Sequence, residues 1–187
     1  MLADATETLA ALLRTSLPGP PAVTVEPPGA AAPEHVRHEE GLGLFLFHTA
    51  EDPHARAADW SDARSPDGAV VGRRPPVRRY RLHFLLWAWA PTAARRLHLL
   101  DGAMTALAGT ETIPEAVRVG ALAEHGGLVR LILAPDRSGN DPLAEVWSAL
   151  QRPLEPSLEV VLAADLVPPV QPVADPARLL DLSAGRI

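Results

Sequence analysis

The 187-residue sequence contains no cysteine, no lysine and few aromatic residues. Without cysteine, the chain can form no disulfide, Cys-ligated zinc site or iron–sulfur cluster, and it has no thiol for catalysis. Its seventeen basic residues are all arginine, and its formal net charge is −6. This acidic balance argues against a nucleic-acid or anionic-membrane partner, because both need a concentrated basic face.

Long hydrophobic runs are also missing. The longest one, residues 82–91, is far shorter than a bilayer span and includes His83. The first seventeen residues carry acids and no uninterrupted apolar core, unlike a secretory signal. We therefore expect a soluble, intracellular protein of the cytoplasm with no membrane partner. Its length suits one domain, residues 1–167, followed by a proline-rich C-terminal arm, residues 168–187.

Hydrophobic periodicity predicts alternating helices and strands. The helices are expected over residues 3–17, 92–109 and 140–153, and the strands over residues 22–28, 41–52, 78–91, 113–122, 127–135 and 156–167. Asp4 or Thr6 is a plausible cap of the first helix. The core stripe of the second helix is expected to consist of Leu97, Leu100, Met104 and Leu107. This order predicts an α/β (α+β) fold, a mixed β-sheet flanked by helices.

Residues 52–76 show no sustained periodicity and many turn residues, which predicts a long central loop that is either functional or disordered. Trp60 stands alone in this polar segment and has little intrachain core to join, so we expect it at an interface. An arginine cluster follows, made of Arg73, Arg74, Arg78, Arg79 and Arg81. It is either a contact for an acidic surface of a partner or the solvated entry to a strand.

The strand expected over residues 78–91 has two unlike faces, because side chains alternate along a strand. One face is apolar throughout and consists of Tyr80, Leu82, Phe84, Leu86, Ala88 and Ala90. The other begins with charged residues and turns apolar at Leu85, Trp87 and Trp89. The end of this strand therefore needs cover on both sides. Either the helix over residues 92–109 or a neighbouring subunit supplies it, which makes these three residues interface candidates.

Catalytic motifs are not apparent. His35 and His38 are three residues apart, and His48 lies near His54, but no HExxH spacing occurs and no serine lies in a G-x-S-x-G elbow. The glycines do not form a phosphate-binding loop. We therefore predict no catalytic, cofactor-binding or metal-binding residues and no cofactor. A small metal-dependent enzyme built on these four histidines remains the alternative.

Five segments carry a family resemblance through their order and spacing. They are "MLADATETLAALL", "LGLFLFHTAED", "PPVRRYRLHFLLWAWA", "AARRLHLLDGAMTAL" and "DPLAEVWSALQRPLEPSLEVVL". Together they resemble the amino-terminal domain of the cap, or tail-terminator, proteins of phage-tail-like contractile injection systems, over roughly residues 1–167. The sequence departs from the family at residue 101, which is Asp followed by Gly102 where the usual "LLG" places glycine directly. The arm after Val167 does not align.

The resemblance implies a structural protein and not an enzyme, with a sandwich of a mixed sheet and helices. Its implied role is a ring, expected to be a hexamer, at the end of tube and sheath that lies away from the baseplate, where it stops polymerisation. The implied partners are other copies of the chain, the inner tube protein and the sheath protein. An adaptor that neither oligomerises nor caps a polymer is a further alternative.

Overall fold

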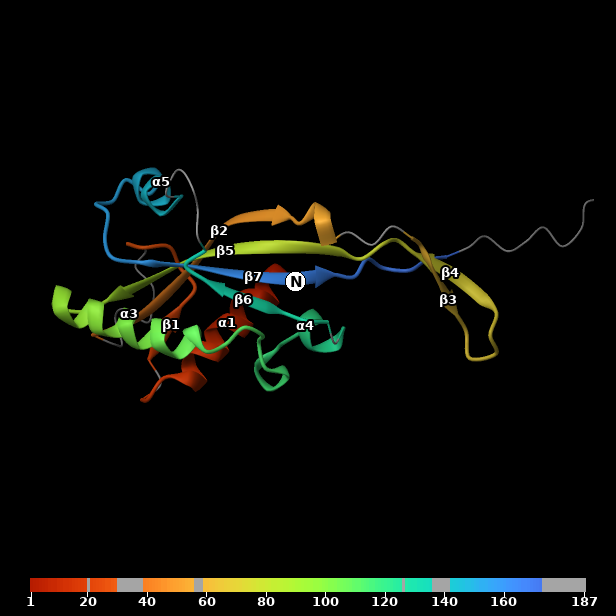
Figure 1. The fold of residues 1–187 in the computed structure, drawn as a ribbon, viewed down its shortest axis with the longest axis horizontal. Helices are drawn as coiled ribbons and strands as arrows, with labels where there is room; N and C mark the ends of the chain where they lie inside the picture. The colour runs from red at the N-terminus through yellow and green to blue at the C-terminus, as the bar shows by residue number, and fades with distance from the viewer. Residues whose placement is uncertain (20, 30–38, 56–58, 126, 136–141, 173–187) are drawn as a thin grey trace, which may run out of the picture.

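The computed structural model describes residues 1–19, 21–29, 39–55, 59–125, 127–135 and 142–172. Helices and strands are interspersed along the chain, as Figure 1 shows. The helices are α1 (Leu2–Ser16), α3 (Ala93–Ala108), α4 (Ala121–Glu124) and α5 (Pro142–Ala149), with 3-10 turns η1 (Pro53–Ala55) and η2 (Glu115–Val117). The strands are β1 (Ala22–Thr24), β2 (Gly41–Glu51), β3 (Ser61–Arg64), β4 (Val70–Arg74), β5 (Arg78–Trp89), β6 (Arg130–Leu133), β7 (Leu158–Leu166) and β8 (Gln171–Pro172).

Five strands form the main sheet in the order β1-β2-β5-β7-β6. β1 and β2 are parallel, and the other neighbours are antiparallel, so the sheet is mixed as predicted. β5 lies at the centre, paired with β2 on one side and β7 on the other. A strand with two neighbours and cover on both faces should be apolar along its length. That explains why every residue from Leu82 to Ala88 is buried.

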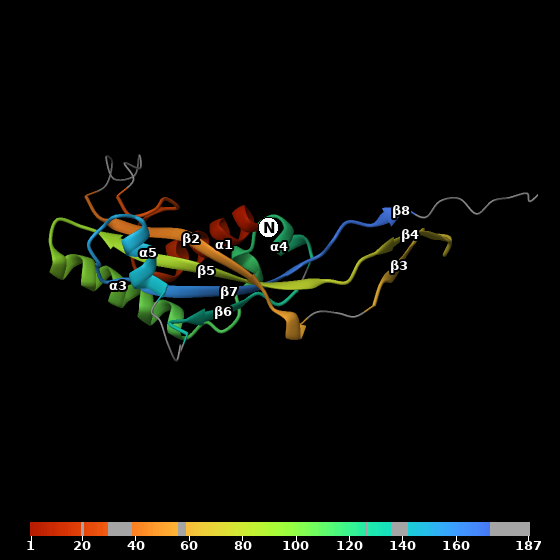
Figure 2. The ribbon, with the colours of Figure 1, turned by 90° about the horizontal axis from the view of Figure 1, so that it is seen from above.

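Helices α1 and α3 lie on one face of the main sheet, and α5 lies on the other (Figures 1 and 2). The larger core forms under α1 and α3, where Leu9 and Leu13 meet the alternate residues Leu82, Phe84 and Leu86 of β5, all fully buried. The apolar face predicted for the strand over residues 78–91 is therefore correct. Each of these side chains contributes about 1.5–3 kcal/mol by leaving water, which holds α1 and α3 against this face of the sheet.

Two expectations about the helices are wrong in detail. On α3, Leu100 and Leu107 are buried together with Ala103, but Leu97 and Met104 are 52% and 42% exposed. The core stripe is thus rotated toward Ala103, whose small side chain lets the helix approach the sheet.

The cap expected for the first helix is also different. α1 begins after Met1 and has no side-chain cap. Asp4 instead reaches across to α4, where its Oδ2 accepts a hydrogen bond of 3.2 Å from the backbone N–H of Ala121. The short polar side chain therefore serves the start of a neighbouring helix rather than its own.

Two segments differ from their predicted type. Residues 113–122 contain η2 and the start of α4 instead of a strand. The segment expected to be a long loop, residues 52–76, contains η1 and the two strands β3 and β4. β3 and β4 are formed by strand pairing across a tight turn. Hydrophobic periodicity alone therefore does not predict them.

Candidate functional site

A second, three-stranded sheet of order β3-β4-β8 projects from one end of the main sheet (Figures 1 and 2). Residues 75–77 connect it to β5, and residues 167–170 connect β7 to it. Each connection contains two consecutive prolines, which cannot donate to a hydrogen-bond ladder and so separate the two sheets. We call residues 59–74 and 170–172 the arm. It shares only residues 170–172 with the C-terminal arm predicted over residues 168–187.

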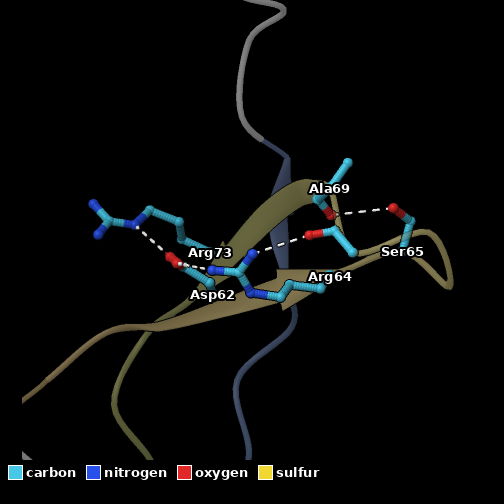
Figure 3. Close-up of polar contacts among 6 residues, drawn as sticks. Asp62, Arg64, Ser65, Ala69 and Arg73 are labelled. Atoms are coloured by element: carbon cyan, nitrogen blue, oxygen red, sulfur yellow. Dashed lines mark hydrogen bonds and ion pairs between the residues drawn. The ribbon is translucent and has the colours of Figure 1, made fainter.

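Local interactions shape the hairpin of the arm. β3 and β4 pair antiparallel from Ser61↔Arg74 to Arg64↔Val70, with a register shift next to Arg64. In the turn, the N–H of Ser65 donates to the carbonyl of Ala69 at 2.9 Å, and the Ser65 hydroxyl donates to the same oxygen at 3.1 Å (Figure 3). The turn also requires the left-handed backbone of Gly68, with φ of 88°.

The third strand of the arm is short. β8 makes only two pairs with β4, Gly72↔Pro172 and Arg73↔Gln171. Gly72 allows this approach, because a Cβ there would lie 2.4 Å from Cγ1 of Val170. No described strand pairs with the outer edge of β3. Among the described strands, the outer edge of β3 therefore leaves backbone groups without a ladder partner.

Apolar side chains of the arm are exposed. Trp60 is 47% exposed, and Val70 and Val71 are 42% and 52% exposed. A two- or three-stranded ribbon of this size has no core of its own and is marginal alone in water. Exposed apolar groups on such a ribbon are typical of a surface that another chain covers.

Two arginines of the arm share one carboxylate. Asp62 lies 3.3 Å from Nε of Arg73 and 3.4 Å from Nη2 of Arg64, as Figure 3 shows. Both arginine side chains are 59% exposed. Arg74 forms no ion pair with any residue that the structure describes. Over the arm as a whole, three arginines are matched by three aspartates, Asp59, Asp62 and Asp67, so it carries no net formal charge.

The predicted arginine cluster does not form one surface. Arg73 and Arg74 lie on the arm, whereas the other three lie at the start of β5, where each meets a carboxylate of the main sheet. The pairs are Arg78–Glu51 at 3.6 Å, Arg79–Asp165 at 2.7 Å and Arg81–Asp52 at 2.8 Å. These contacts raise the pKa of Arg79 and lower the pKa of Asp52 through direct hydrogen bonds. The β5 arginines thus link neighbouring segments of the main sheet, and a partner contact for any of the five arginines remains a prediction.

Leu85 and Trp87 are buried within the chain, at 0% and 5% exposure, with Trp147 of α5 at 3%. The prediction that α3 covers these residues is therefore wrong. α3 lies on the opposite face of the sheet, and α5 covers the face that carries Leu85 and Trp87. The Trp147 indole N–H donates to the Ser157 hydroxyl at 3.1 Å, which fixes α5 over the sheet. This cover within one chain removes the basis for assigning Leu85 and Trp87 to an intersubunit contact.

Two glycines make room for the tryptophans of β5. In the β2–β5 register, Gly43 lies opposite Trp87 and Gly41 lies opposite Trp89. A Cβ on Gly43 would fall 2.1 Å from the Trp87 ring, and one on Gly41 would fall 2.3 Å from the Trp89 ring. Trp89 is partly exposed and packs at the margin of the α5 cluster. Of the three apolar candidates on this face, only Trp89 keeps surface for a partner.

Histidines line a groove of 470 Å³ on the half of this face that α5 leaves open. His48, His54 and His83 all border it, and His83 Nδ1 lies 2.7 Å from Oε1 of Glu159 in a buried pair. His35 and His38 lie outside the described residues. Among the residues that are described, no group of three or more His, Asp or Glu side chains is arranged to hold a metal ion.

Within the described part of the chain, none of the helices has the length and apolar character to cross a bilayer. A comparison with curated protein sequences finds no match.

A sequence profile of the Pvc16 N-terminal domain matches residues 4–178. The chain belongs to the Pvc16 N-terminal domain family. The match runs past the predicted boundary at residue 167 and includes β8. The predicted division at residue 167 remains a prediction.

Two solved structures share the fold of this Pvc16 N-terminal domain. One is the PVC sheath/tube terminator of an extracellular contractile injection system in its extended state, with a TM-score of 0.67 at 15% identity. The other is the tube-terminating cap of the anti-feeding prophage, with a TM-score of 0.62 at 15% identity. The matches cover 100% and 96% of this chain but only 64% and 60% of those chains. The chain thus has a terminator-like mixed α/β fold and spans under two thirds of each relative.

The arm is the feature that sequence reasoning missed. A signal for it exists, because Pro66, Asp67 and Gly68 are typical turn residues and lie between two short extended segments. The prediction for Trp60 placed it in a loop, whereas the structure places it immediately before β3 on the arm. Its exposure agrees with the expectation, but a contact with another chain remains a proposal.

Proposed function

We propose that this chain is a structural subunit of the cap that terminates the tube and sheath of a contractile injection system. Membership of the Pvc16 N-terminal domain family carries the proposal, and the fold shared with a sheath/tube terminator and a tube-terminating cap supports it. Function then lies in protein contacts, without catalysis or a cofactor. The proposed partners are further copies of the chain, arranged as a hexameric ring, the inner tube protein and the sheath protein.

The arm gives this proposal a physical basis. A cap subunit must contact a neighbour on each side and a polymer end, so it needs apolar surface that its own core does not cover. The arm offers such surface at Trp60, Val70 and Val71, together with the unpaired edge of β3. Assembly in the cytoplasm, before the particle is released or fired, fits a chain without a membrane-spanning helix among its described residues.

Deletion of the gene, followed by electron microscopy of the particles, tests this function. We expect tubes and sheaths of uncontrolled length, and normal length after complementation with the complete chain. Complementation with a chain that lacks the arm tip, residues 62–73, should fail although the main sheet is retained. Particles of normal length in the deletion strain would contradict the proposed function.

A further inference from the structure

The arm and the main sheet share one strand register. In the main sheet, the pairing of β5 with β7 starts at Arg78↔Leu166. On the arm, the pairing of β4 with β8 ends at Arg73↔Gln171. Between these two pairs each chain segment has four residues, so the antiparallel register continues from one ladder into the other. β4 and β5 therefore form one interrupted strand, and β7 and β8 form its interrupted partner.

The interruption consists of prolines that face one another. In the shared register, Pro75 falls opposite Pro169, and Pro76 falls opposite Pro168. The two described ladders include none of these four residues. Proline has no backbone N–H, and its ring holds φ at about −65°, far from the value of about −140° in an antiparallel strand. The two connections therefore lie apart between the sheets, as Figure 2 shows.

The pair Pro76–Pro168 falls where a continuous ladder would have two hydrogen bonds. The carbonyl of Arg79 accepts a hydrogen bond of 2.8 Å from the N–H of Asp52, so the backbone groups of Arg79 point to the β2 side of β5. Backbone groups alternate in direction along a strand, so those of even-numbered residues in β5 point to β7. Continued beyond β5, this alternation directs residue 76 toward residue 168, and residue 75 away from its partner. Two prolines at the inward pair therefore remove both N–H donors at once.

Within the described ranges, neither an apolar core nor an ion pair fixes the direction of the arm. No arm residue belongs to either apolar cluster of the main sheet. The ion pairs of the arm stay within it, at Asp62, and those of the β5 arginines stay within the main sheet and its flanking turn. The chain also enters the arm ahead of Trp60, through residues 56–58, which lie outside the described residues. The proline connections are thus the described links between the two sheets.

We propose that the facing proline pairs form a joint, at which the arm turns as a unit relative to the main sheet while the strand register is kept. The prolines keep each connection extended, so the arm stays at its distance from the main sheet. The residues that turn are those that flank the prolines, Arg74, Val77, Val167 and Val170. The main sheet keeps its core in every position of the arm. The joint is a property of the single chain and does not depend on the proposed cap function.

Restoring the missing donors tests the shared register. In the complete chain, Pro76→Thr/Pro168→Thr supplies two N–H groups that point to the partner strand, so the two ladders should join into one. The matched control is Pro75→Thr/Pro169→Thr, which makes the same chemical change with N–H groups that point away from the partner strand. Amide exchange measured by NMR should be roughly tenfold slower at residues 76 and 168 of the first variant than at residues 75 and 169 of the control. Equal exchange in the two variants overturns the shared register and the joint with it.

Spin labels follow the turning of the arm itself, because the natural chain has no cysteine to interfere with their attachment. Labels at Ala69→Cys on the arm and Thr105→Cys on the exposed side of α3 report one distance across the joint by pulsed electron paramagnetic resonance. Dilution with unlabelled chain removes distances between copies. We expect a broad distance distribution with all four prolines present and a narrower one in the variant with threonine at residues 76 and 168. A narrow distribution with the prolines present means that the arm is a fixed strut and overturns the joint, even where a proline variant does not fold.

Discussion

Phe84 in the main sheet has no exposed surface, whereas Trp60 and Val71 on the arm keep about half of theirs, 47% and 52%. The two regions are continuous in the chain, since β4 leads into β5 across two prolines. The main sheet buries its apolar groups against α1, α3 and α5. The arm leaves its apolar groups exposed. Stability and assembly should therefore depend on different residues.

Truncation in the core should give the largest effect on stability. Phe84→Ala removes a fully buried ring between the sheet and the helices, and we expect the free energy of unfolding to fall by about 3–5 kcal/mol. Urea denaturation followed by circular dichroism measures it. The matched change on the arm, Val71→Ser, should stay within about 0.5 kcal/mol. An arm variant as destabilising as the core variant would mean that the arm is part of the folding core.

The same contrast explains what could be predicted from the sequence. The central strand was recognisable because Leu82, Phe84 and Leu86 alternate on a face that one layer of helices covers. The helix that covers the other face could not be recognised in this way. α5 contacts Trp87 through Trp147, which lies about sixty residues further along the chain. Periodicity reports which face is apolar, but it does not tell which distant helix covers it.

The arm was predicted less well for a related reason. Its residues face water on both sides, so hydrophobic alternation gives no signal, and only the turn residues mark it. The pairing of β8 with β4 joins residues about one hundred positions apart, from Gly72 to Pro172, which no local pattern encodes. Of the interface candidates, Trp60 was found as a large aromatic in a polar segment.

Crowding at the β2–β5 pair should give the next largest effect. Gly43→Ala places a Cβ against the Trp87 ring, so we expect a loss of about 1–3 kcal/mol in the free energy of unfolding. The control is Gly109→Ala, where no atom lies within 4 Å of the new Cβ. Combining Gly43→Ala with Trp87→Leu should recover part of the loss, which a double-mutant cycle measures. Equal stability of the two alanine variants would show that Trp87 moves freely.

His83 and Glu159 form a buried pair of ionisable side chains within the main sheet. Glu159 is 5% exposed and its carboxylate binds the His83 ring at 2.7 Å. Glu159→Ala leaves the imidazole without this partner, and the cost should be about 1–3 kcal/mol. Glu159→Gln keeps an oxygen acceptor and should cost less. Thermal unfolding of the three proteins tests this order, and an alanine variant as stable as the natural chain would contradict it.

The smallest expected effect on stability lies at the contact between Arg81 and Asp52, near the junction of the main sheet and the arm. A hydrogen bond from Arg81 is the main reason why the pKa of Asp52 is lowered in the folded chain. A lowered folded pKa stabilises the protein above the unfolded value, and this contribution is lost as the pH falls through the folded value. The stability should therefore decline below about pH 4. Salt should weaken the dependence, since the Arg81 side chain is 51% exposed.

Asp52→Asn should flatten this acid decline, because the amide carries no titrating charge. Arg81→Ala removes the largest cause of the shift and should flatten the decline only in part, because the backbone N–H of His54 still donates to the carboxylate at 3.2 Å. Urea midpoints at two acidic pH values, with and without added salt, compare the three proteins. An unchanged pH slope in both variants would place the acid sensitivity elsewhere, at carboxylates such as Glu40, whose pKa is lowered by its hydrogen bonds with Arg95. That outcome would tie acid sensitivity to the start of α3, where Arg95 lies, rather than to the junction of the two sheets.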